Sequence, residues 1–120
     1  MGETVFKGKI VHCPVEITLR VIGGKYKSLL LYYLTEERVL RFGELRRLVP
    51  LASKKMLTQQ LRELEVDGLV KRKVFHQVPP KVEYSLSSRG KSLNSLLEAM
   101  GAWGVKHAPH YREKEEGPRI

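Results

Sequence analysis

The sequence contains only one cysteine, Cys13, among its 120 residues. A single cysteine excludes a disulfide within the chain and a cysteine-based zinc site built by one chain, so any disulfide has to join two molecules. The sequence also lacks an apolar run near the roughly 20 residues that a membrane span needs, and its N-terminus lacks the apolar core of a secretion signal. We therefore expect a cytoplasmic protein with no membrane partner.

Acidic residues are scarce relative to basic ones. The chain has 22 Lys and Arg against 13 Asp and Glu, a net charge of +9, and residues 41–91 alone hold twelve basic and five acidic side chains. Such a concentration of positive charge favours a polyanionic partner, because each phosphate that is neutralised releases a condensed counterion. A soluble protein that is basic without any such partner is the alternative on charge alone.

The length and composition indicate one compact domain. Hydrophobic residues make up 42% and charged residues 29% of the chain, which is typical of a globular protein. We expect an N-terminal arm over residues 1–12, a folded domain over 13–107 and a solvated C-terminal tail over 108–120.

The first half of this domain has a helical pattern. A helix is expected to open at Cys13-Pro14 and to end at Gly23-Gly24, followed by a leucine-rich helix over 25–35. Residues 39–41 are expected to be extended. A third helix over 42–49 would place Leu45 and Leu48 inward and stop at Pro50.

The next segment predicts a helix-turn-helix. Ser53 is a good N-cap for a helix that runs to Asp67, where Gly68 would cap the C-terminus. Leucines recur along it at helical spacing, at positions 57, 61 and 64. This helix would follow the third one after a turn at residues 50–52.

The second half predicts a hairpin and a long helix. Residues 70–76 and 81–86 have the pattern of two strands, and the prolines between them would form the tip of a wing. A helix is then expected from Ser87 to about His107. The fold class is thus α+β and mainly helical: a winged helix-turn-helix with a two-stranded β-hairpin wing and terminal dimerisation helices.

An apolar stripe on the last helix is longer than one small domain needs, which predicts a homodimer. The first helix is expected to contribute to the interface as well. The predicted interface residues are Val15, Leu19, Leu93, Leu96, Leu97, Met100 and Trp103.

The outward face of the helix after Ser53 carries hydrogen-bond donors and cations, as expected of a face that binds nucleic acid. Lys54 and Lys55 lie in its first turn, where the helix dipole disfavours cations, so an anion is expected there. A solvated helix face is the alternative. The predicted DNA-binding residues of this helix are Ser53, Lys54, Lys55, Thr58, Gln59 and Arg62.

Three wing lysines, Lys71, Lys73 and Lys81, are expected to contact the DNA backbone or the minor groove. Lysines of an edge hairpin also serve simply to prevent aggregation, and this alternative stays open.

No residue pattern indicates catalysis. Gly24-Lys25 resembles part of a phosphate-binding loop, but Leu19 stands where that loop needs a glycine. His107 and His110 have no further metal ligands near them in sequence. We expect no enzyme activity, no cofactor and no metal.

Cys13 is a candidate redox sensor. A thiol at a helix N-terminus is in a position where the helix dipole favours the thiolate. A small capping or buried residue is the alternative role.

Together these motifs resemble the HxlR-type winged helix-turn-helix transcriptional regulators. The matching stretches lie at residues 13–16, 22–25, 41–45, 53–64, 67–70 and 78–86. The resemblance implies a homodimer formed by the terminal helices, with the helix after Ser53 in the major groove and the wing near the minor groove. It also implies a sequence-specific regulator of nearby genes that binds a palindromic operator in double-stranded DNA.

Several members of this family resemble thiol-based sensors of oxidants or electrophiles, with a cysteine at the position of Cys13. Two departures stand out: Tyr26 replaces the tryptophan usual after Gly-Gly-Lys, which we expect to affect packing only, and no second cysteine exists. Redox switching would then need intermolecular or small-thiol chemistry. The sequence does not identify a small-molecule effector.

Two other functions stay open at this point. A winged-helix module that binds protein would not need the cationic helix face. A non-specific RNA-binding or architectural protein would need the charge but no fixed dimer spacing.

Overall fold

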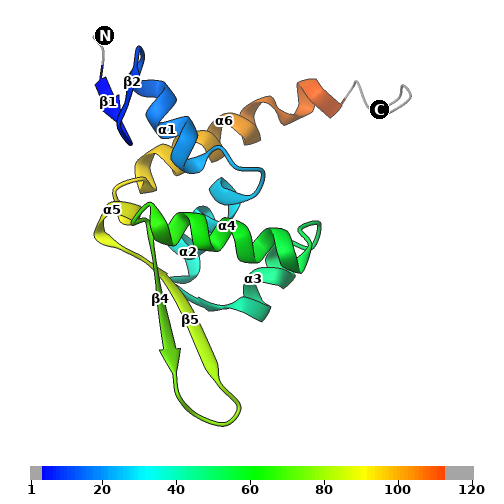
Figure 1. Ribbon diagram of the computed structural model, residues 1–120. Coiled ribbons are helices and arrows are strands. Elements are labelled where there is room, and N and C mark those ends of the chain that lie inside the picture. Colours follow the sequence, from blue (N-terminus) through cyan, green and yellow to red (C-terminus); the bar gives the residue numbers. More distant parts are fainter. Residues whose placement is uncertain (1–3, 113–120) are drawn as a thin grey trace.

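The computed structural model describes residues 4–112 and forms a winged helix-turn-helix, as predicted (Figure 1). In chain order the elements are β1 (Thr4–Phe6), β2 (Lys9–Val11), α1 (Pro14–Ile22), α2 (Lys27–Glu37), β3 (Val39–Arg41), α3 (Phe42–Leu48), α4 (Lys54–Val66), β4 (Val70–Phe75), β5 (Lys81–Leu86), α5 (Ser88–Lys91) and α6 (Asn94–Arg112).

The wing is the hairpin of β4 and β5, which projects from the helical body in Figure 1. Its strands pair antiparallel, from Val70 opposite Leu86 to Phe75 opposite Lys81. β3 adds to the free edge of β5, so the sheet has the order β3-β5-β4. The two-stranded wing that the sequence predicted is therefore part of a three-stranded sheet.

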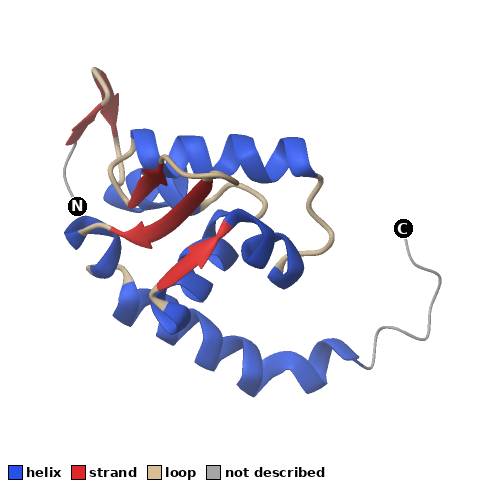
Figure 2. Cartoon of the chain, turned by 90° about the horizontal axis from the view of Figure 1, so that it is seen from below, coloured by secondary structure: helices blue, strands red, loops and turns tan. Residues whose placement is uncertain are grey.

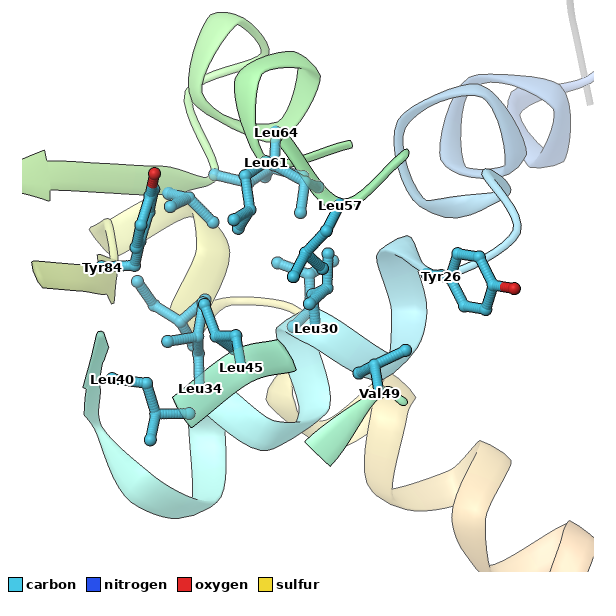
Figure 3. Packing of buried hydrophobic residues seen from close by; sticks show 14 of the residues in the cluster. Tyr26, Leu30, Leu34, Leu40, Leu45, Val49, Leu57, Leu61, Leu64 and Tyr84 are labelled. Carbon is cyan, nitrogen blue, oxygen red and sulfur yellow. The ribbon is translucent and has the colours of Figure 1, made fainter. Parts of the chain in front are cut away.

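The core lies where α2, α3 and α4 meet the base of the wing (Figure 3). Leu57, Leu61 and Leu64 of α4 are almost fully buried, which confirms the helical spacing seen in the sequence. Leu45 of α3 is buried too. The prediction for Leu48 was wrong: its side chain is 37% exposed, because the helix ends there and the chain turns away toward Pro50.

Both ends of α4 form as predicted. The Ser53 hydroxyl accepts a hydrogen bond from the backbone N–H of Met56 at 3.0 Å. At the other end, Gly68 adopts a φ of +77°, and Leu69 donates its N–H to the carbonyl of Leu64. A left-handed residue here costs least when it is glycine, so the helix ends sharply and leads straight into β4.

The C-terminal helix differs from the prediction at both ends. Instead of one helix from Ser87, the chain forms the short α5 and then α6, which continues past His107 to Arg112. Pro109 removes one backbone donor, but this part of α6 is exposed, so water can satisfy the carbonyl that is left free. The predicted start of the tail at residue 108 therefore falls within α6, and residues 113–120 lie outside the described part.

The predicted N-terminal arm contains a β-hairpin. β1 and β2 pair antiparallel, and the buried Val11 ends the second strand. At the hairpin turn, the Lys7 ammonium lies 2.5 Å from the carboxylate of Asp67, the residue that follows α4. This ion pair connects the hairpin to the C-terminal end of α4. Within residues 4–112, no helix is long and apolar enough to cross a membrane.

Candidate nucleic-acid interface

The exposed side of α4 forms a shallow concave surface. Five of the six α4 residues predicted to bind DNA line it together: Lys54, Lys55, Thr58, Gln59 and Arg62. The sixth, Ser53, is exposed at the N-cap. Because the leucines take the inward positions of the helix, these polar residues share the opposite face.

The two hydroxyls at this face also serve the helix itself. Ser53 caps the first turn, and Thr58 donates to the carbonyl of Lys54 at 2.8 Å. Lys54, Lys55, Gln59 and Arg62 form no hydrogen bond or ion pair with other side chains in the described range 4–112. Their donor groups are available to a ligand.

The wing lysines lie on the face of the hairpin that points away from α4. Directly opposed residues of an antiparallel pair share a face, and Lys73 opposes Glu83 while Phe75 opposes Lys81. Lys81 and Lys73 lie over the Phe75 ring, at 4.3 and 4.8 Å from its centroid. Lys71, on the same face, lines a separate cavity at the base of the wing.

Arg72 of the wing, which the sequence analysis did not select, forms an ion pair with α4. Its side chain lies 3.4 Å from the carboxylate of Glu65 on α4. Side chains alternate between the two faces of a strand, so Arg72 has to lie on the opposite face from Lys71 and Lys73. This alternation could have identified it from the sequence.

Sequence analysis also missed two arginines of α3. Arg46 and Arg47 line a shallow surface with Pro50 and Ala52, at the turn that leads to α4. A basic pair in the last turn of the first helix of a helix-turn-helix is a recognisable signal, because this helix crosses the DNA backbone.

Buried polar contacts hold α4 against the start of α2. Gln60, which is 7% exposed, accepts a hydrogen bond from the backbone N–H of Tyr26 at 3.0 Å. The Lys27 ammonium lies 3.1 Å from the Glu63 carboxylate. Gly24 lies against the side chains of Gln60 and Lys27, and a Cβ on it would come within 2.8 Å of the Gln60 amide. The glycine therefore permits the close approach of the α1–α2 loop to α4.

Tyr26 has a role beyond packing, which corrects the expectation for this position. Its ring is buried, and its hydroxyl donates to the carbonyl of Leu51 at 3.2 Å (Figure 3 shows the ring). Leu51 belongs to the turn between α3 and α4. Tyr26 thus connects the N-terminus of α2 to the turn at Leu51 and to the middle of α4 at Gln60.

Cys13 is the N-cap residue of α1 and is a half-buried free thiol. Its side chain makes no capping hydrogen bond. It lies two residues after the hairpin strand β2 and so between the hairpin and α1.

The predicted dimer interface divides into exposed and buried residues. Val15 and Leu19 of α1 are more than half exposed, and so is Trp103 of α6. Leu96 and Met100 extend this exposed stripe along α6. Leu97 is buried and Leu93 partly buried against the core of the same chain.

The aromatic side chains near the end of α6 stack along one side of the helix. The rings of Trp103 and His107 lie 4.5 Å apart, and Tyr111 follows one turn later. No cluster of three metal-ligating side chains occurs within residues 4–112.

The described chain has the arrangement of a DNA-binding winged helix: a turn joins two helices, the second presents free donors, and a hairpin follows. Residues 21–112 match the family described as HxlR-like helix-turn-helix. The protein belongs to this family.

The named relatives are transcriptional regulators and not enzymes. The HTH-type regulator YybR of Bacillus subtilis is 54% identical over 92 residues, which cover 77% of this chain and 73% of the relative. YtcD of the same organism is 56% identical over 99 residues, covering 82% and 78%.

Of two similar solved structures, one is named a redox regulator and the other a transcriptional regulator in its reduced form. The redox regulator HypR in its reduced form is 48% identical with a TM-score of 0.79, and 84% of this chain and 99% of that chain are covered. The reduced form of YodB from B. subtilis is 30% identical with a TM-score of 0.68, covering 90% and 100%.

Proposed function

We propose that this transcriptional regulator binds a palindromic operator in double-stranded DNA as a homodimer, with α4 in the major groove. The single observation that carries the proposal is the set of unpaired donors on the outer face of α4. Arg62 and Gln59 would read guanine and adenine, the bases with which these side chains form two hydrogen bonds. Lys54 and Lys55 of the first turn would take phosphates.

Further cations extend the surface on both sides of α4. Arg46 and Arg47 would contact the backbone beside α3, and Arg72 would contact it beside the wing. The wing lysines Lys73 and Lys81 would reach phosphates beyond the wing tip. Each phosphate contact adds about −0.9 to the slope of log K against log salt.

Dimerisation would bury the exposed stripe of α1 and α6. With two-fold symmetry, the two α4 helices would meet half-sites about 34 Å apart or at a multiple of this distance. The operator would then be an inverted repeat.

The test is to compare Gln59→Ala and Arg62→Ala with wild type on an operator found by footprinting the protein's own promoter region. We expect both variants to fold and to lose operator affinity, by about 1–3 kcal/mol where a base contact is lost. Arg72→Ala should weaken operator and random DNA alike and make the salt slope shallower by about 1.

Lys106→Ala, an exposed cation on α6, is the matched control and should leave DNA binding unchanged. Unchanged binding by both α4 variants contradicts the assignment of the recognition helix. Equal affinity for random RNA would favour a non-specific binder.

We also propose that Cys13 makes DNA binding sensitive to oxidants. Similar structures named as redox regulators support this, as does the position of Cys13 between the N-terminal hairpin and α1. Two Cys13 thiols of a dimer would form one disulfide and pass two protons and two electrons to diamide, which becomes the hydrazine. The bond would move α1, and with it the spacing of the two α4 helices.

Operator affinity of wild type and Cys13→Ser, each with and without diamide, tests this step. We expect diamide to change the affinity of wild type only and to give a linked dimer in a non-reducing gel. The same response in both proteins would remove Cys13 from the mechanism.

A further inference from the structure

A cavity of about 460 Å³ lies at the base of the wing, between the sheet, α2 and the two C-terminal helices. α2 contributes Leu34, β4 contributes Lys71, α5 contributes Lys91 and α6 contributes Asn94. Its volume is in the range of pockets that hold small organic molecules. Figure 2 shows the neighbouring α6 following one side of the molecule toward the C-terminal end.

Three cations line this cavity: Arg38, Lys71 and Lys91. None of its lining residues is acidic. Within residues 4–112 none of the three forms an ion pair. Three like charges around one hollow repel one another, and a bound anion would relieve this repulsion.

The backbone at Arg38 is held in an unfavourable conformation. Its φ is +70° with a ψ of −53°, a region that favours glycine, at the residue that ends α2. Such a conformation is unfavourable in a non-glycine residue and is found at ligand clamps. Here it places an arginine, rather than a glycine, at the cavity.

Asn94 and Val39 also line the cavity. The Asn94 side-chain oxygen is buried and has no hydrogen-bond partner among the described residues. A buried acceptor without a partner is costly, so a small turn of this side chain toward a donor on a bound ligand would be favourable. Val39, which is 48% exposed, provides apolar surface, whereas Leu34 and Leu86 are almost fully covered.

We propose that this cavity binds a small organic anion: a carboxylate or phosphate for the three cations, an apolar body for Val39 and a hydrogen-bond donor for Asn94. DNA is a poor fit for Lys71, because this lysine lies at the base of the wing and lines the cavity, whereas Lys73 and Lys81 lie nearer the tip. The site goes beyond the proposed function. A ligand here would touch both the wing and the first turn of α6, so it would join the DNA-binding and dimerisation parts.

The probe is para-hydroxyphenylacetate, which has a carboxylate, a ring and a hydroxyl donor, and para-hydroxyphenylacetamide is its neutral counterpart. Binding to the full chain is measured without DNA, by amide proton–nitrogen correlation NMR. We expect saturable shifts at Thr35, Val39 and Ser85, competition by inorganic phosphate, and about tenfold weaker binding of the amide, because charge-assisted hydrogen bonds are lost. Equal binding of acid and amide, or no saturable shift with either anion at millimolar concentration, would overturn the proposal.

Two variants test the residues, and both are expected to fold. Lys91→Gln and Arg38→Gly should each weaken binding of the acid about tenfold. Lys106→Gln removes an equal charge on α6, away from the cavity lining, and should bind as wild type does. An equal loss of acid binding in all three variants would mean that net charge alone causes the effect, and this would overturn the site.

The operator assay separates this inference from the proposed function. Lys91→Gln should keep the operator affinity of wild type in the absence of ligand. Failure of wild type to bind an operator would count against the proposed function and leave the NMR result standing.

Discussion

Tyr84 in the middle of β5 is buried, and its burial raises the pKa of its hydroxyl above the ordinary value of 10.0. The folded state therefore keeps this proton at a pH where the unfolded chain has lost it. Unfolding then releases a proton, so stability falls as pH rises above about 10. We expect the alkaline loss of stability to be smaller in Tyr84→Phe than in wild type, measured by urea denaturation between neutral pH and pH 11. Parallel curves for the two proteins would contradict this.

Two glycines should respond to the same substitution with opposite signs. A Cβ on Gly90 in α5 would lie 2.1 Å from the carbonyl oxygen of Leu69, so Gly90→Ala forces backbone to move and should cost about 1–3 kcal/mol or more. Gly43 in α3 has no atom near its Cβ position. Gly43→Ala should add about 0.5–1 kcal/mol by restricting the unfolded chain. Denaturation at one protein concentration compares them, and destabilisation by both would be the contrary result.

At the scale of the element, α4 has two adjacent glutamines that face opposite ways. Gln60→Ala would leave the buried N–H of Tyr26 unpaired and should destabilise the protein by about 1–3 kcal/mol. Gln59→Ala, on the exposed face, should leave the free energy of unfolding unchanged while lowering operator affinity. Chemical denaturation and a DNA titration on the same two proteins test this reversal. A Gln60→Ala protein as stable as wild type would show that the hydrogen bond from Tyr26 to Gln60 does not hold α4 in place.

The sequence predicted α4 well because leucine spacing and end signals are local. It could not predict that Gln60 turns inward, since its partner is the backbone of Tyr26, 34 residues away. For the same reason, the hydrogen bond from the Tyr26 hydroxyl to Leu51 has no local signal.

The wing shows the same limit at the level of strands. Alternation predicted both strands, but the face that each lysine takes depends on the pairing register and on which side α4 packs. The sequence analysis consequently did not select Arg72, although it pairs with Glu65 of α4. The end of α6 was missed because Pro109 stops a helix only where its lost hydrogen bond cannot be replaced by water.

At the scale of the whole molecule, the exposed stripe on α6 predicts how the protein assembles. Met100→Glu would put a charge among apolar side chains, and we expect a monomer in sedimentation with much weaker operator binding. Val105→Glu is the matched control, because Val105 is 79% exposed and lies off the stripe. The single tryptophan, Trp103, should emit at longer wavelength in the monomer. A dimeric Met100→Glu protein would place the interface elsewhere.

The attachment of α4 at three places has a consequence for the thermodynamics of recognition. Its start is joined to α2 through the turn at Leu51, its middle through Gln60 and its end to the N-terminal hairpin through Asp67. A helix held in this way has already lost its conformational entropy on folding, so little ordering is left for the moment of binding. Association with DNA should therefore resemble the docking of a rigid body, with a heat-capacity change no larger than the buried apolar surface requires.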